Sequence, residues 1–186
     1  IPWQHLIQFV VPDFFGNPVT RNDWFGHYAE WASFIGIWPL FLAIYVMARL
    51  RSWRVIFFLI LGLSSLALAV NSPLSLLLVS LKIPALSTSA LSRIIVLFSF
   101  SLAVLAGLGF DKLHQDLEMK KAKKAIIGII ILISILIVSV WSLILIGKLY
   151  PNEWLIVAKR NFILPTAFFA AGAFLLLMAI RKKIFL

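Results

Sequence analysis

The chain has 186 residues, of which 62% are apolar and only 13% are charged, and its mean hydropathy is +1.04. A water-soluble domain carries charge on about a quarter of its residues, so this composition excludes an ordinary soluble protein and predicts burial in lipid. The formal net charge of +10 is dispersed among short connections, which argues against a nucleic-acid partner. The absence of cysteine excludes disulfides and thiolate chemistry.

The start of the sequence carries no basic region followed by a short apolar stretch and a cleavage site. We therefore expect no signal peptide, and we expect the chain to be the interior or carboxyl part of a longer protein. Residues 1–31 are expected to form an extracytoplasmic segment that enters the membrane. Residues 32–186 are expected to form a transmembrane helical region.

Acidic, imidazole and aromatic side chains gather at the end of the first segment. If Asn22 caps a helix, then Asp23, His27 and Glu30 share one helical face at i, i+4 and i+7. A face of two carboxylates and an imidazole would suit a divalent metal ion or a sugar acceptor, although no metal-ligand set is assigned. The simpler alternative is a solvated helix end whose acids are favoured by the helix dipole.

Five uncharged apolar runs predict an all-α polytopic bundle of spanning helices. Their lengths of about 16 to 23 residues lie near the roughly 17–25 that cross a bilayer as helix. A shorter apolar stretch at residues 74–81 follows Asn71, Ser72 and Pro73 and predicts an interfacial or re-entrant helix. The five predicted spans are residues 32–48, 55–70, 94–110, 125–147 and 163–180.

Two features within these spans predict how they pack. Pro39 lies inside the first run and predicts a kink. Ser99, Ala103 and Gly107 follow one another at four-residue spacing in the third run, and such small residues let another backbone approach closely.

The distribution of basic residues predicts the orientation in the cytoplasmic membrane. Residues 49–54, 111–124 and 181–186 hold 11 of the 17 Lys and Arg residues. By the positive-inside rule these connections face the cytoplasm, so the amino end of this piece lies outside and its carboxyl end inside. None of the five runs contains Asp, Glu, Lys, Arg or His, which argues against an ion-coupled transport site within them.

A basic residue stands at the outer mouth of the third span. Arg93 follows the hydroxyl residues at 87–89 and Ser92. An arginine near hydroxyls and helix-end amides is suited to a lipid-linked phosphate. The alternative is an arginine whose head snorkels to the membrane interface.

Several motifs together resemble the bacterial YfhO-like integral membrane proteins of the GT-C-type glycosyltransferase superfamily, over residues 9–113. The motifs are PDFFGNP at 12–18, YAE at 28–30, FIGIWPL at 34–40, IPAL at 83–86, SR at 92–93 and FSLAVLAGLGFD at 100–111.

The resemblance implies an enzyme that moves a sugar from a polyprenyl-phosphate carrier to an extracytoplasmic acceptor such as a cell-wall polymer. Its catalytic acid would lie on an earlier outer loop that this chain lacks, so no catalytic residue is placed here. Membrane lipid, the lipid-linked sugar and the envelope acceptor are the expected partners. A non-catalytic membrane subunit, or a lipid or polymer translocator, is the alternative. Under the transferase hypothesis Arg93, Lys159 and Arg160 serve the lipid phosphate, and Asp23, His27 and Glu30 line the acceptor side.

Overall fold

The computed structural model describes residues 1–26, 31–81, 91–147 and 150–182, and this part of the chain is all-α. Three of its helices are long and apolar enough to cross a membrane, and a bent helix pair makes a fourth if it is one span. The chain is therefore a candidate multi-pass membrane protein with three or four spanning helices. The described elements are η1 (Trp3–Phe9), η2 (Pro18–Thr20), α2 (Ile37–Arg49), α3 (Trp53–Ala69), α4 (Pro73–Ser80), η3 (Leu91–Ile94), α5 (Ile95–Glu118), α6 (Lys123–Ile146) and α7 (Asn152–Lys182).

Helix α2 is shorter than the apolar run that contains it. The run was predicted to be helical from residue 32, but the helix begins at Ile37, because Gly36 has a φ of 100° that helical geometry does not allow. The 13 residues of α2 extend about 20 Å at 1.5 Å per residue, less than the roughly 30 Å of a bilayer core. Pro39 falls in the first turn, where its missing N–H costs no helical hydrogen bond, so the predicted kink is wrong.

The short helix predicted after the second run is present as α4, and it is bent by 66° from α3. Ser72 caps it: its hydroxyl accepts from the backbone N–H of Ser75, and the hydroxyl of Ser75 accepts from the N–H of Ser72. This capping box and Pro73 at the first helical position specify a new helix start. The sequence at residues 72–75 therefore starts a second helix in a new direction, and α3 does not continue straight into α4.

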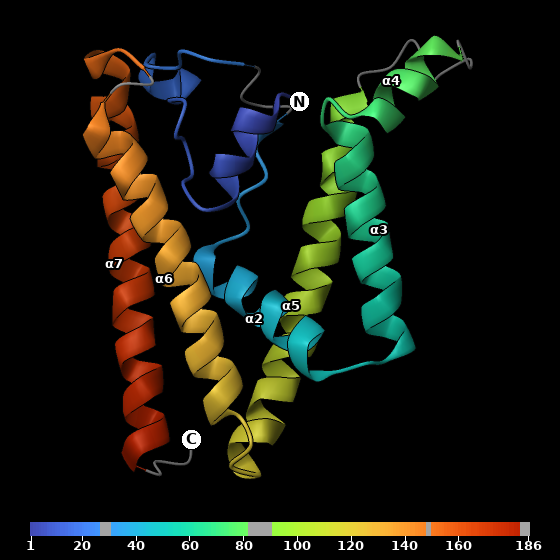
Figure 1. Ribbon diagram of the computed structural model, residues 1–186, viewed down its shortest axis with the longest axis vertical. Helices are drawn as coiled ribbons and strands as arrows, with labels where there is room; N and C mark the ends of the chain where they lie inside the picture. The colour runs from blue at the N-terminus through green and yellow to red at the C-terminus, as the bar shows by residue number, and fades with distance from the viewer. Residues whose placement is uncertain (27–30, 82–90, 148–149, 183–186) are drawn as a thin grey trace.

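Figure 1 shows the helices as two groups with α2 between them. Helices α6 and α7 lie side by side on one side, and α3 and α5 lie on the other. Helix α2 crosses obliquely between these groups and packs against α5, α6 and α7. The amino-terminal segment occupies the space above α2, at the end of the molecule opposite the α5–α6 connection and the carboxyl-terminal end of α7 (Figure 1).

Close packing of α5 uses a different stripe from the one predicted. Ala103 is exposed, and a Cβ added to Gly107 would meet nothing within 4 Å. Gly109 instead lies directly against the backbone carbonyl of Leu42 in α2, and the fully buried Ser101 lies beside Gly62 of α3. Small residues do carry the packing, as expected in membranes, but on the neighbouring face of the helix.

Candidate functional site

The amino-terminal segment is fastened to helices on both sides. On the α5 side, the ring of Phe9 stacks on Phe98 with centroids 4.8 Å apart. On the α7 side, Trp24 stacks on Trp154 with centroids 4.6 Å apart and planes 8° from parallel. These contacts hold residues 1–26 between the two helix groups.

A tight turn presents Asp13 to this region. Asp13 has a φ of 53°, and Gly16 follows with a φ of 84°. The backbone carbonyl of Asp13 accepts 2.8 Å from Nδ2 of Asn161 in α7, and its carboxylate accepts 3.0 Å from Nδ2 of Asn17. Aspartate tolerates the left-handed conformation better than most residues, and such conformations persist where surrounding contacts enforce them.

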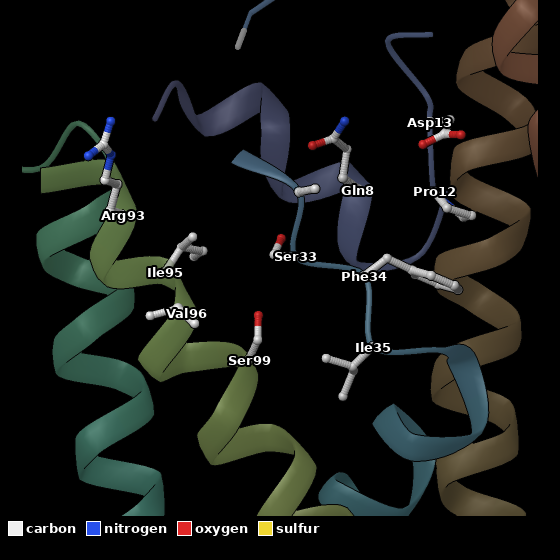
Figure 2. A pocket seen from close by; sticks show the side chains of 11 residues that line it. Gln8, Pro12, Asp13, Ser33, Phe34, Ile35, Arg93, Ile95, Val96 and Ser99 are labelled. Atoms are coloured by element: carbon white, nitrogen blue, oxygen red, sulfur yellow. The ribbon is translucent and has the colours of Figure 1, made fainter. Parts of the chain in front are cut away.

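A cavity of about 840 Å³ lies between this segment and the start of α5, and Figure 2 shows its side chains. Arg93 stands at one side of the mouth, with Gln8 and Asp13 across from it, and the hydroxyls of Ser33 and Ser99 lie deeper (Figure 2). Arg93 is solvent-exposed and lies in η3. The lining residues are Gln8, Pro12, Asp13, Ala32, Ser33, Phe34, Ile35, Arg93, Ile95, Val96 and Ser99.

The chemistry of this Arg93 cavity is amphipathic. Among the described residues that line it, five are polar or charged, with one cation, Arg93, and one carboxylate, Asp13. Ile35, Ile95 and Val96 supply apolar wall below them (Figure 2). A guanidinium beside neutral hydrogen-bonding groups favours a phosphate or a phosphorylated sugar, and the apolar wall favours a hydrocarbon attached to it.

A second cavity, of about 500 Å³, lies on the α7 side of the same segment and contains Arg160. Pro12, Asp13 and Phe34 line both cavities and so form their common wall. In Figure 2 the ring of Phe34 extends away from Arg93. The lining residues of this Arg160 cavity are Pro12, Asp13, Phe34, Gly36, Ile37, Trp38, Pro39, Arg160, Asn161, Leu164, Pro165 and Phe168.

A buried histidine lies behind the Arg93 cavity. His5 is 2% exposed, and its Nδ1 lies 3.2 Å from Oε1 of the cavity-lining Gln8. The imidazole is surrounded by the rings of Phe15, Phe25 and Trp31, with centroids 4.2 to 5.0 Å away. Desolvation lowers the pKa of His5 below its ordinary value, although the contact with Gln8 opposes this shift. The neutral imidazole therefore supports Gln8 from within an aromatic cage.

The structure separates the predicted phosphate-binding residues. Arg93 and Arg160 line different cavities, and Lys159 is exposed and lines neither. The helical face predicted at the outer end does not form at Asp23, which is exposed in a non-helical stretch. Asn22 does not cap a helix there; its Oδ1 accepts from the backbone N–H of Asn17 at 2.9 Å. His27 and Glu30 lie outside the described residues.

Sequence reasoning missed the residues that form the wall between the two cavities. Asp13 and Phe34 were noted only as parts of the motifs at 12–18 and 34–40, and no role was expected of Gln8. The turn signal of the PDFFGNP motif was the available clue to Asp13, since Gly, Asn and Asp accept positive φ. Contact of Asp13 with α7 depends on Asn161, 148 residues away.

Sequence reasoning also missed a buried carboxylate at the far end of α5. Asp116 is 1% exposed, and one of its oxygens lies 2.9 Å from both the Tyr45 hydroxyl and Nε of Arg49. Its other oxygen lies 2.9 Å from Nζ of Lys112. This cluster ties α2 to α5, remote from both cavities.

Among the described residues no group of three or more His, Cys, Asp or Glu side chains is placed to hold a metal ion. No protein family, curated protein or solved structure matches the chain.

Proposed function

We propose that the chain is the carrier-binding part of a multi-pass membrane glycosyltransferase, in which the Arg93 cavity receives the phosphate head of a polyprenyl-phosphate-linked sugar. The observation that carries this proposal is the arrangement of one exposed guanidinium, neutral polar side chains and an apolar wall around a single cavity of about 840 Å³. Arg93 pairs with the phosphate, because a guanidinium offers parallel N–H donors to two phosphate oxygens. The resemblance in the sequence supports the transferase class.

The polar interior of the cavity suits a sugar as well as a phosphate. The carboxamide of Gln8 and the hydroxyls of Ser33 and Ser99 offer donors and acceptors that match sugar hydroxyls. Ile95 and Val96, both on α5, give the prenyl chain an apolar path on a helix long enough to span the membrane. The extracytoplasmic acceptor would approach from the open mouth, on the side of Asp13.

The finer topology belongs to the same proposal. We place five passages in the cytoplasmic membrane, through α3, α5, α6, α7 and the run from residue 32 to the end of α2, with α4 at the outer interface and residues 1–31 outside. The concentration of 11 of the 17 basic residues in three connections supports this orientation. The amino-terminal segment and the α5–α6 connection also lie at opposite ends of the molecule (Figure 1).

A lipid translocator is the second candidate, and the bend between α3 and α4 favours it. Discontinuous helices commonly line the substrate paths of transporters, and these two helices meet at 66°. A translocator would move the carrier without breaking the bond between sugar and phosphate. Incubation of the full-length protein in vesicles with a polyprenyl-phosphate-linked radiolabelled sugar separates the two classes.

The transferase predicts label in the acceptor polymer, and an Arg93→Gln variant that loses it. The Arg51→Gln variant is the matched control, because Arg51 is exposed and lines neither cavity. If the label crosses the membrane but stays on the carrier, the protein is a translocator and the transferase proposal is wrong. Equal transfer by wild type and Arg93→Gln would remove Arg93 from the site.

A further inference from the structure

The Arg160 cavity is a site in its own right, separate from the Arg93 cavity. We propose that it binds the phosphate head of a second membrane lipid, so that the chain holds two lipid phosphates, one on each side of Phe34. This rests on the proposed function only for the ligand of the Arg93 cavity. The second site is argued from its own residues.

Charge identifies the head group of the ligand. Arg160 is the only cation among the described residues that line this cavity, and it is exposed. The amide of Asn161 is engaged with the backbone carbonyl of Asp13 at 2.8 Å. The guanidinium is thus the principal group offered to a ligand, and its planar pairs of donors match a phosphate.

The shape of the wall identifies the ligand as a lipid. Arg160, Leu164 and Phe168 follow one another at four-residue spacing on α7 and all line the cavity, so they form one stripe along the helix. Leu164 and Phe168 are each 61% exposed. A phosphate held at Arg160 would place its hydrocarbon chain along this stripe, over about 12 Å at 1.5 Å per residue.

The opposite wall is fixed in place. Nε1 of Trp38 donates a hydrogen bond of 3.1 Å to the backbone carbonyl of Phe168, so the indole bridges α2 and α7. Trp38 also stacks on Phe169, with centroids 5.9 Å apart. The apolar wall is therefore built in advance, which lowers the entropic cost of binding a chain.

The composition of the two cavities distinguishes their ligands. Of the residues that the structure describes, five that line the Arg93 cavity are polar or charged, whereas the Arg160 cavity is smaller and has three, of which Asn161 is engaged elsewhere. The smaller cavity thus suits a lipid with a bare phosphate better than a glycosylated one. The carboxylate of Asp13 lies in the shared wall, and its negative charge opposes a single phosphate bridging both arginines.

The experiment counts ligands by native mass spectrometry of the delipidated chain in detergent, with farnesyl phosphate as the probe. Wild type is expected to bind two molecules. Arg160→Gln and Arg93→Gln are each expected to bind one, because loss of a charge-assisted pair weakens affinity about tenfold to 100-fold. Lys159→Gln is the matched control for Arg160 and is expected to bind two. Arg160→Lys, which keeps the charge, is expected to retain the second molecule at reduced affinity.

Each other outcome overturns a defined statement. A wild type that binds one molecule, lost only in Arg93→Gln, removes the second site and leaves the proposed function standing. Loss of one molecule only in Arg160→Gln leaves the second site standing and removes the proposed phosphate site at Arg93. If farnesol binds as well as farnesyl phosphate, the phosphate is not recognised. If inorganic phosphate binds at Arg160 as well as farnesyl phosphate does, the hydrocarbon chain is not recognised. Thermal unfolding of each variant in the same detergent identifies any loss of binding that is caused by misfolding. If Arg160→Gln is misfolded, binding of the second molecule by Arg160→Lys tests the site instead.

Discussion

The hydroxyl of Tyr45 donates a 2.9 Å hydrogen bond to the carboxylate of Asp116, and the two residues are 71 positions apart in the chain. Arg49 and Lys112 each lie 2.9 Å from the same carboxylate. A carboxylate with 1% exposure must have such partners to remain charged. The link fixes α2 along α5 at the end remote from the cavities, and its energetics can be tested directly.

We expect Asp116→Ala to destabilise the protein by about 2–3 kcal/mol, because it leaves two cations without their partner. This loss of stability is smaller than that for a fully buried ion pair, because Arg49 and Lys112 are partly exposed. Tyr45→Phe removes one hydrogen bond and is expected to cost about 1 kcal/mol. Denaturant unfolding in detergent measures both. Asp111→Ala, on an exposed part of the same helix, is the control, and equal stability of the Asp111 and Asp116 variants would contradict the structural role.

Asp13→Asn is expected to strengthen the binding of farnesyl phosphate in both cavities. The substitution keeps the side-chain size and tolerates the φ of 53°, but it removes a negative charge from the shared wall. A unit charge a few ångströms from a phosphate is worth about 1 kcal/mol in a wet site, or about fivefold in affinity. Asp23→Asn lines neither cavity and should leave both affinities unchanged. Weaker binding in Asp13→Asn would show that the carboxylate supports the ligand instead of repelling it.

Arg93→Ala is expected to lower transfer by the full-length protein more than Arg93→Lys does. A lysine keeps most of the attraction to a phosphate, although it loses the paired donors of the guanidinium. The rate of sugar transfer, measured at matched expression, tests this order. Wild-type rates in both variants would return Arg93 to the role of an interfacial anchor.

The stability of the protein is expected to fall as the pH is lowered below about 6.5, the ordinary pKa of histidine. The pKa of His5 is lowered in the folded state, so below that pH the unfolded chain binds the proton more readily than the folded chain. Folding stability due to neutral His5 is therefore full above this pH and is lost as the pH falls through the lowered pKa. Melting temperatures between pH 7.5 and 5 provide the measurement. His5→Gln should flatten the profile, whereas His114→Gln, which is exposed, should not.

Single-cysteine labelling tests the orientation, because the chain contains no native cysteine. We expect an impermeant reagent to label Val19→Cys and Asn152→Cys in intact cells, and to label Arg51→Cys and Lys121→Cys only after lysis. Val19 is 90% exposed, so its labelling does not require a conformational change. Labelling of position 121 but not of position 19 in intact cells would reverse the proposed topology.

Hydropathy predicts the long helices of this chain well, because a helix in lipid must satisfy its backbone within one apolar segment. It does not predict where α2 begins, since that depends on the φ of Gly36 and not on apolarity. The packing stripe of α5 was displaced for a similar reason. By size alone, Ser99 and Ser101 could each allow a close helix contact. Ser101 and Gly109 are the covered positions because α2 and α3 lie on that face of α5.

The sequence shows which charged residues stand near the predicted membrane interfaces, but it does not show that two separate cavities divide them. Arg93, Lys159 and Arg160 were predicted as phosphate ligands under the transferase hypothesis, and that role stays a prediction. The placement of the two arginines in different cavities depends on Phe34 and Asp13. The position of Asp13 in turn depends on Asn161, a contact that no local pattern encodes.

The segment that forms the wall between the cavities contacts two helices. Phe9 stacks on Phe98 of α5, and the carbonyl of Asp13 accepts a hydrogen bond from Asn161 of α7. A sideways displacement of one helix group relative to the other must therefore be absorbed by the segment that carries this wall. Because the packed interior contains little empty space, the position of the wall depends on the distance between α5 and α7. A thicker or thinner bilayer, by altering helix tilt, would then redistribute volume between the two cavities without any change in their residues.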